Sequence, residues 1–147
     1  MKSLWTAQDR QEILRRLNQL SPEAVESWGT LTPHAALAHL ADSMRMALAE
    51  ISEAPISGVL RQQPFKGLAI NVRPMPKGVK GPAGYFTNAP TAFAKDRVEL
   101  VRLIDLCANR PADASWGDHP FVGRLTKAQW GTLAYKHVDH HLRQFGC

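Results

Sequence analysis

TKAQWGTLAYKHVDHHLRQFG, residues 126–146, has apolar side chains at helical spacing with histidines among them. The stretch opens with Thr126 and Gln129, a T-x-x-Q capping box in which each side chain can bond a backbone N–H at the other's position. Apolar residues then follow at i, i+3, i+4, i+8, i+12 and i+15, namely Trp130, Leu133, Ala134, Val138, Leu142 and Phe145. We therefore predict an amphipathic helix that begins after Thr126 and packs this face against a core.

Two histidines share that face of the helix. His137 and His141 are at i+7 and i+11 of the same series, so both point inward among apolar side chains. Residues four apart on a helix have Cβ atoms about 5–6 Å apart, so their ring nitrogens can converge on one ion at about 2.0–2.1 Å. The alternative is a pair of core histidines, each bonded to a backbone group or a carboxylate, because an unpartnered buried imidazole costs about 1–3 kcal/mol.

A third metal ligand is needed for tight binding, and the candidate is His39. This residue lies next to Leu40 at the edge of an earlier apolar stripe, so it can face inward, whereas His34 lies in an exposed first turn. His119 can approach the same site from a loop, but the sequence HP is more typical of a turn residue before proline.

The chain outside one insertion has the same helical periodicity. A first helix ends at Ser21 and Pro22, with a stripe of Ile13, Leu14, Leu17 and Leu20. A second spans about 33–51, where Thr32 is the N-cap and Pro33 takes the first helical position, and a third spans about 92–108. No period-two apolar alternation lasts five residues outside the insertion. We predict an all-α chain, a four-helix bundle formed by residues 1–147 as one domain.

The second and third helices are joined by a long crossover insertion, about residues 54–91. No Asp or Glu occurs from Ala54 to Lys95, while this stretch holds the basic residues Arg61, Lys66, Arg73, Lys77, Lys80 and Lys95. Its many Pro and Gly residues oppose long helices, so we predict at most one short helix or strand within residues 58–72. Two interpretations stay open: a solvated loop, or a flap that draws anionic substrates towards a site.

Composition limits the classes of function. Of the 147 residues, 44% are hydrophobic and 21% charged, and no apolar run approaches the ~20 residues of a membrane helix. The N-terminal MKSLWTAQDRQE lacks the apolar region of a secretory signal, so we expect a cytoplasmic protein with no membrane partner. Cys107 and Cys147 match no metal or redox spacing, and no disulfide is expected. The net charge of +5 forms no dense basic cluster, which disfavours nucleic acid as a partner.

Three segments carry a resemblance to a known family: WGTLTPHAALAHLADSMRMAL (28–48), HPFVGRLTKAQWGTL (119–133) and YKHVDHHLRQFG (135–146). The chain resembles the DinB/YfiT-like superfamily of bacterial four-helix-bundle proteins, in an uncharacterised subgroup. There, one histidine of the second helix and an H-x-x-x-H pair of the fourth bind a divalent metal, commonly zinc or nickel. The resemblance implies His39, His137 and His141 as ligands, and a homodimer as the assembly. The superfamily's HHRGQ motif reads HHLRQ here, with Gln144 kept and arginine at 143.

A three-histidine site predicts metal-dependent chemistry. Three neutral nitrogens leave a fourth position open, where a bound water or thiol loses its proton near neutral pH and becomes a nucleophile. We predict a thiol transferase or hydrolase that acts on a small molecule, such as a low-molecular-weight thiol or an anionic compound. The alternative is a metal- or ligand-binding helical module without turnover. Groups that can line the pocket or orient the ligands are Asp42, His140, Arg143 and Gln144, together with Asp105 and Asp139.

Overall fold

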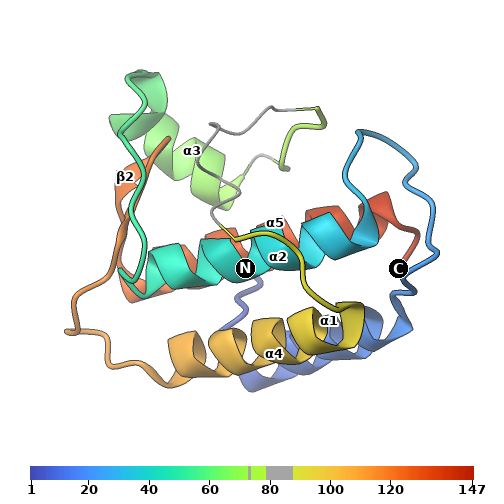
Figure 1. The fold of residues 1–147 in the computed structure, drawn as a ribbon. Helices are drawn as coiled ribbons and strands as arrows, with labels where there is room; N and C mark the ends of the chain where they lie inside the picture. Colours follow the sequence, from blue (N-terminus) through green and yellow to red (C-terminus); the bar gives the residue numbers. More distant parts are fainter. Residues whose placement is uncertain (73, 79–87) are drawn as a thin grey trace.

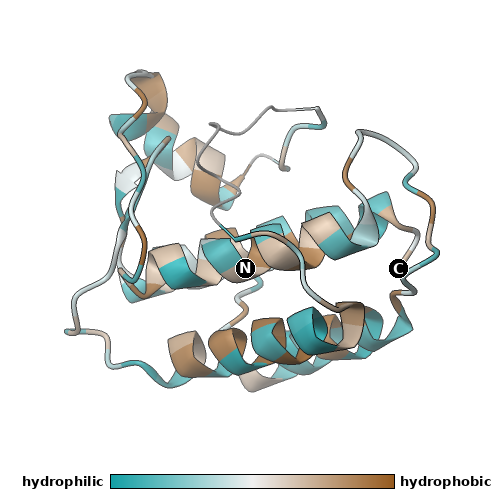
Figure 2. Cartoon of the chain, in the orientation of Figure 1, coloured by the Kyte–Doolittle hydropathy of each residue, from teal (hydrophilic) through white to brown (hydrophobic). Residues whose placement is uncertain are grey.

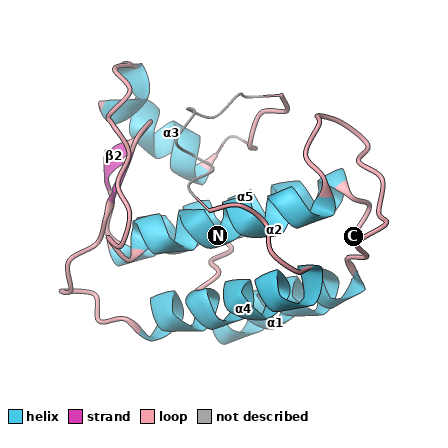
Figure 3. Cartoon of the chain, viewed as in Figure 1, coloured by secondary structure: helices cyan, strands magenta, loops and turns pink. Residues whose placement is uncertain are grey.

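The chain is mainly α-helical in the computed structural model, which describes residues 1–72, 74–78 and 88–147 (Figures 1 and 3). In chain order, the described elements are α1 (Ala7–Gln19), α2 (Pro33–Ala47), the 3-10 turn η1 (Val59–Arg61), α3 (Phe65–Asn71), α4 (Phe93–Asn109), β1 (Asp118–His119), β2 (Gly123–Arg124) and α5 (Lys127–Gln144). The strands β1 and β2 pair antiparallel over two residues each. The prediction of an all-α chain is therefore confirmed at the level of a mainly helical fold.

Helix α5 begins where its sequence predicts. The side chain of Thr126 accepts a hydrogen bond from the backbone N–H of Gln129 (3.3 Å), and the side chain of Gln129 accepts one from the N–H of Thr126 (3.0 Å). The predicted apolar face is buried throughout, since none of its residues is more than 8% exposed: Trp130, Leu133, Ala134, Val138, Leu142 and Phe145. The capping box thus sets the start of the helix, and the apolar periodicity sets the side that faces the core.

Helix α2 begins at its predicted cap but ends earlier than expected. Thr32 Oγ1 accepts from the N–H of Ala35 (3.2 Å), as the N-cap pattern requires. The helix ends at Ala47 and not near residue 51, because Ala49 adopts a left-handed φ of 61°. The carbonyl of Ala47 accepts a hydrogen bond from the N–H of Gly117 (3.1 Å), so a distant loop supplies a partner for one of the last carbonyls of the helix.

The long helices pack along their apolar stripes. Helix α2 contacts both α4 and α5, and α1 contacts α5. Figure 1 shows α2 and α5 running in opposite directions, and Figure 2 shows hydrophobic and hydrophilic residues alternating along the helices. Fully buried side chains from α1, α2, α4 and α5 form one core: Ile13, Leu17, Leu37, Met44, Leu100, Leu103, Ile104 and Val138. This packing places the inward faces of α2 and α5 side by side.

Residues 58–72 of the crossover insertion contain the short helix α3, as predicted, and also the 3-10 turn η1, which was not predicted. Helix α3 contacts α5, its residue Ile70 is fully buried, and Lys136 Nζ donates to the carbonyls of Ala69 (2.8 Å) and Ile70 (3.1 Å). This part of the insertion is therefore anchored beside α5. Five of its basic and breaker positions, Arg73, Lys80, Gly81, Pro82 and Gly84, lie outside the described residues.

The structure also bears on the expectations of no membrane-spanning helix and no disulfide. No helix among the described residues is long and apolar enough to cross a lipid bilayer. Cys107, which is buried, and Cys147 are both free thiols.

Candidate metal centre

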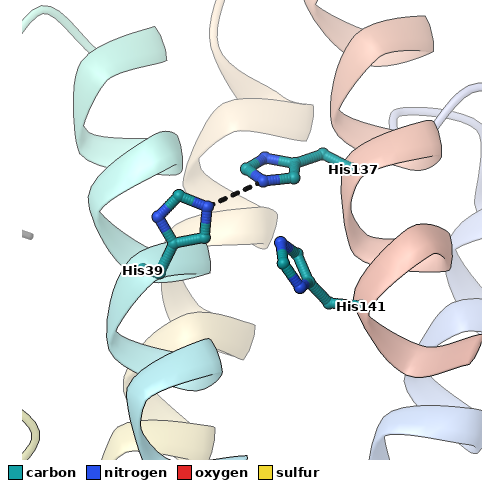
Figure 4. A group of neighbouring side chains, drawn as sticks. All are labelled: His39, His137 and His141. Atoms are coloured by element: carbon teal, nitrogen blue, oxygen red, sulfur yellow. Dashed lines mark hydrogen bonds between the residues drawn. The ribbon is translucent and has the colours of Figure 1, made fainter. Parts of the chain in front are cut away.

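Three histidines from two helices meet inside the fold. His39 projects from α2, and His137 and His141 project from successive turns of α5 towards it (Figure 4). Their residues are only 7%, 7% and 8% exposed, respectively. The antiparallel packing of α2 and α5 brings residue 39 opposite residues 137 and 141, which are far away in the sequence. The structure thus gathers the three histidines that the sequence singled out and turns all three rings inward.

The ring nitrogens lie at distances that suit a shared ion. The Nε2 atoms of His39 and His137 are 2.9 Å apart, and one ligand nitrogen from each of the three histidines lies within 4.8 Å of the others. Two nitrogens bound tetrahedrally to one zinc ion at 2.0–2.1 Å would lie about 3.3 Å apart. The separation of His39 and His137 is close to this value, and the third nitrogen lies within 4.8 Å of both, so the three nitrogens converge on one region. The chemistry of the donor set, with three imidazoles, also suits zinc and nickel.

Burial keeps the imidazoles of His137 and His141 neutral. It lowers the pKa of His137 well below the ordinary value, and positive charge on His39 or His141 would lower that pKa further. Burial also lowers the pKa of His141 to about 4, against a smaller opposing effect of its hydrogen bond to Gln144. A metal ligand must offer an unprotonated nitrogen, so these two side chains are ready to bind at neutral pH.

Gln144 fixes which nitrogen of His141 carries the proton. Its Nε2 donates to the carbonyl oxygen of Trp28 (2.6 Å), an atom that can only accept, so its Oε1 must face the ring of His141. His141 Nδ1 lies 2.9 Å from this Oε1 and therefore carries the hydrogen, which leaves the lone pair on Nε2. Gln144 is only 2% exposed, so solvent does not compete for these bonds. The predicted role of Gln144 as a group that orients a ligand agrees with this geometry.

Ser43 has a similar place beside His137. Its Oγ lies 3.2 Å from Nδ1 of that ring, so a proton on Nδ1 again leaves Nε2 available. The sequence analysis missed Ser43. The available signal was its position four residues after His39, on the same face of α2.

The acidic residue Asp42 is buried at 2% exposure, and its carboxylate bonds two residues outside the histidine cluster. Arg45 Nη1 lies 2.9 Å from Oδ1, while the backbone N–H of Asn88 donates to Oδ2 (3.0 Å) and the side-chain amide of Asn88 to Oδ1 (2.6 Å). Asp42 therefore joins α2 to the segment before α4. Its predicted role in orienting a metal ligand stays a prediction.

The charged residues of α5 near the pair face away from it. Arg143 is exposed and forms an ion pair with Asp139 (3.0 Å), whose carboxylate also binds Arg16 of α1 (2.7 Å). Asp105, on α4, lies 3.4 Å from Arg10. These contacts tie the helices together, and none of them leads towards the three histidines.

The remaining histidines occupy different surroundings. His140 is half-buried, with its ring 5.2 Å from that of His141 and 5.7 Å from the ring of Trp28. His34, in the first turn of α2, packs against Phe93 (5.2 Å between ring centroids). Neither belongs to the group of three, and for His34 this agrees with the sequence interpretation.

His119, at the end of β1, is a partly buried side chain whose imidazole is neutral at pH 7. Its Nδ1 accepts from the backbone N–H of Phe121 (3.2 Å), as expected for a turn residue, and its ring lies 5.7 Å from that of Trp130. Burial, with a smaller effect of the Arg61 charge, lowers the pKa of His119 to about 4. A charge on His119 would depress the pKa of His137, so this histidine lies near the cluster without being one of the three.

Fold and site together define a mainly helical protein with a buried three-histidine group between two antiparallel helices. Residues 2–146 match the family described as "Protein of unknown function (DUF1569)", so the chain belongs to that family. No curated protein and no solved structure matches the chain significantly.

Proposed function

We propose that the chain binds one divalent metal ion, zinc or nickel, through Nε2 of His39, His137 and His141. The observation that carries the proposal is the convergence of three buried ring nitrogens within 4.8 Å. Gln144 directs the Nε2 lone pair of His141 inward, and Ser43 is placed to accept from Nδ1 of His137 and so to leave Nε2 of that ring for the ion. The Nε2 atoms of His39 and His137 face each other at 2.9 Å, and a shared ion could take the place of the hydrogen bond between them.

We further propose that the chain is a DinB-like four-helix bundle in which α1, α2, α4 and α5 are the four helices. The supporting features are the order of these helices, the long insertion between α2 and α4, and the positions of one histidine on α2 and an H-x-x-x-H pair on α5. A single domain spanning residues 1–147 belongs to this proposal.

The proposed activity is that of a metal-dependent enzyme, a thiol transferase or a hydrolase, acting on a small molecule. A divalent ion held by three histidines keeps a further position for a water molecule or a thiol, whose pKa it lowers enough to give a nucleophile at neutral pH. The protein's own contribution is a dry, neutral donor set: imidazoles and the uncharged partners Ser43 and Gln144. Because none of these side chains offsets the charge of the ion, the site favours an anionic ligand such as a thiolate.

Metal analysis of untagged protein tests the site itself. We expect about one zinc or nickel per chain after reconstitution, and loss of this metal in His39→Ala, His137→Ala and His141→Ala. His34→Ala is the matched control, since it removes a histidine of α2 that packs on Phe93, and it should keep the metal. Wild-type protein that takes up neither metal would contradict the proposal.

Turnover separates the enzyme from a metal-binding module without activity. Metal-loaded wild-type protein is mixed with a small thiol and an electrophilic acceptor, and free thiol is followed with time. An enzyme consumes thiol faster than the metal-free protein and the His137→Ala variant do. Equal rates in all three samples would favour the non-catalytic module.

A further inference from the structure

A second group of side chains borders the histidine cluster on the side of Trp28. The backbone N–H of Ser27 donates to the carbonyl of Gln144 (2.7 Å), and the side chain of Gln144 donates to the carbonyl of Trp28 (2.6 Å). The same Gln144 side chain bonds His141. One buried amide therefore connects a proposed metal ligand to the segment that precedes α2, and it holds Trp28 next to the site.

Gly29 allows this close approach. It has a φ of +77°, and a Cβ atom at this position would lie 2.9 Å from Nε2 of Gln144. A side chain here would be strained by its backbone conformation and would press on the amide that orients His141. The placement of Trp28 is thus built into the turn and into the end of α5.

The indole N–H of Trp28 is a hydrogen-bond donor left unsatisfied by the part of the chain that the structure describes. Its Nε1 is buried and has no hydrogen-bond partner among the described residues. A buried unpaired N–H costs about 1–3 kcal/mol, so such donors usually meet an acceptor when the protein is functional. The ring also contacts His140, with centroids 5.7 Å apart and planes at 63°.

A positive charge lies over the same indole. Lys77 Nζ is 4.0 Å from the centroid of the Trp28 ring, and no carboxylate among the described residues lies within ion-pair distance of Lys77. The Trp28 ring therefore contacts both Lys77 and His140. The acid nearest in sequence to His140 is Asp139, which is occupied by Arg16 and Arg143.

We propose that Trp28, Lys77 and His140 form a subsite for a carboxylate of the substrate, beside the three histidines. This inference rests on the proposed metal site, because the other end of the substrate is the group that reaches the ion. The indole N–H and the ammonium group supply one neutral and one charged donor, which suits a single negative charge. The proposed substrate is therefore a small thiol that also carries a carboxylate, and the subsite selects it over an uncharged thiol of the same length.

Ligand titration of the cobalt-loaded protein tests this selectivity. Binding of a thiol to cobalt is followed by the thiolate-to-cobalt absorption band, with 6-mercaptohexanoate and the uncharged 6-mercaptohexan-1-ol as probes. We expect the carboxylate to bind about tenfold more tightly than the alcohol, the effect of a charge-assisted hydrogen bond. Equal binding of the two probes to the wild-type protein would overturn the subsite.

Four variants assign the selectivity to the named residues. Trp28→Phe keeps the ring but removes the N–H, and Lys77→Met keeps the stem but removes the charge; each should bring the two affinities together without weakening the alcohol. Lys77→Arg should keep the preference. Lys95→Met, which removes an exposed lysine on α4, is the control for net charge and should also keep it.

The outcomes separate this inference from the proposed function. A wild-type protein that binds no cobalt refutes the metal site and the subsite with it. Cobalt binding without a preference for the carboxylate refutes the subsite alone. Loss of cobalt binding in Trp28→Phe and Lys77→Met would show that these residues support the fold of the metal site. An equal loss of the carboxylate preference in Lys95→Met would show that the preference comes from the overall charge of the protein. Either result overturns the subsite.

Discussion

Gln144 shows how a single amide can prepare a metal ligand. Its two ends bond groups of fixed character, because the Trp28 carbonyl only accepts and the His141 ring must then donate. This arrangement sets the tautomer of His141 without adding charge. The residue could be predicted as part of the HHLRQ motif, but the carbonyl that orients it comes from a distant turn and left no sequence signal.

Replacing Gln144 separates its two hydrogen bonds. Gln144→Leu removes the acceptor for His141 Nδ1–H and should weaken metal binding about 10- to 100-fold. Gln144→Glu keeps an acceptor facing the ring but sets a second acceptor against the Trp28 carbonyl, so it should weaken metal binding less than Gln144→Leu does. Competition with a coloured chelator measures both. A leucine variant that binds as tightly as wild type would show that the amide does not orient the ligand.

His119 predicts the pH dependence of the metal-free protein. Its pKa of about 4 in the folded state lies below the ordinary value of 6.5, so the unfolded chain binds more protons between these values. The contribution of His119 to the free energy of unfolding should therefore be fully present above pH 6.5. It should be lost as the pH drops towards 4, which lowers the free energy of unfolding by about 1–3 kcal/mol.

Urea unfolding at pH 7 and pH 4.5 checks this sign. His119→Asn keeps an acceptor for the Phe121 N–H but cannot titrate, so it should lose less stability on acidification than wild type does. Burial also depresses the pKa of His141, so a residual acid sensitivity is expected in the variant. Equal losses in the two proteins would rule out His119 as a source.

At the scale of elements, the end of α2 depends on one loop glycine. The N–H of Gly117 bonds the carbonyl of Ala47, and its own carbonyl accepts from Trp130 Nε1 of α5 (3.0 Å). A Cβ at residue 117 would overlap the backbone carbonyl of Met46, which cannot move aside as a flexible side chain can. Gly117 thus joins the ends of the two helices that carry the histidines.

Gly117→Ala should lower the free energy of unfolding by about 1–3 kcal/mol, as overpacking against backbone usually does. Gly58→Ala is the matched control, because a Cβ there meets no atom within 4 Å, and it should be neutral or slightly stabilising. Thermal and urea unfolding of both variants give the comparison. A Gly117→Ala protein as stable as Gly58→Ala would show that the loop can move away from α2 at little cost.

The elements differ in how far sequence alone predicts them. The start and buried face of α5 follow from the Thr126 capping box and a periodic stripe, both of which are local signals. The early end of α2 could not be predicted, because Ile51 continues its apolar stripe, whereas the helix stops where Ala49 takes a left-handed φ that an alanine rarely adopts. A left-handed alanine leaves no signal in the periodicity of the apolar residues.

At the scale of the whole molecule, one candidate site could be predicted from the sequence and the other could not. The inward faces of α2 and α5, together with the family resemblance, indicated that His39 would meet His137 and His141, and the structure places them together. The contact of Trp28 with Lys77 joins a turn before α2 to the basic insertion. Neither segment is periodic, so this contact became visible only in three dimensions.

Metal binding should stabilise the entire fold, because the ion would bridge α2 and α5 only in the folded state. Free zinc at 100 times its dissociation constant adds about 2.7 kcal/mol, which corresponds to roughly 5–10 °C in Tm for a chain of this size. Calorimetry with and without zinc should show this shift in wild type and in His34→Ala, but not in His137→Ala. The shift should shrink as the pH falls from 7 to 5, since protons compete for the ligand nitrogens. An equal zinc-induced shift in His137→Ala would place the stabilising ion elsewhere than between the two helices.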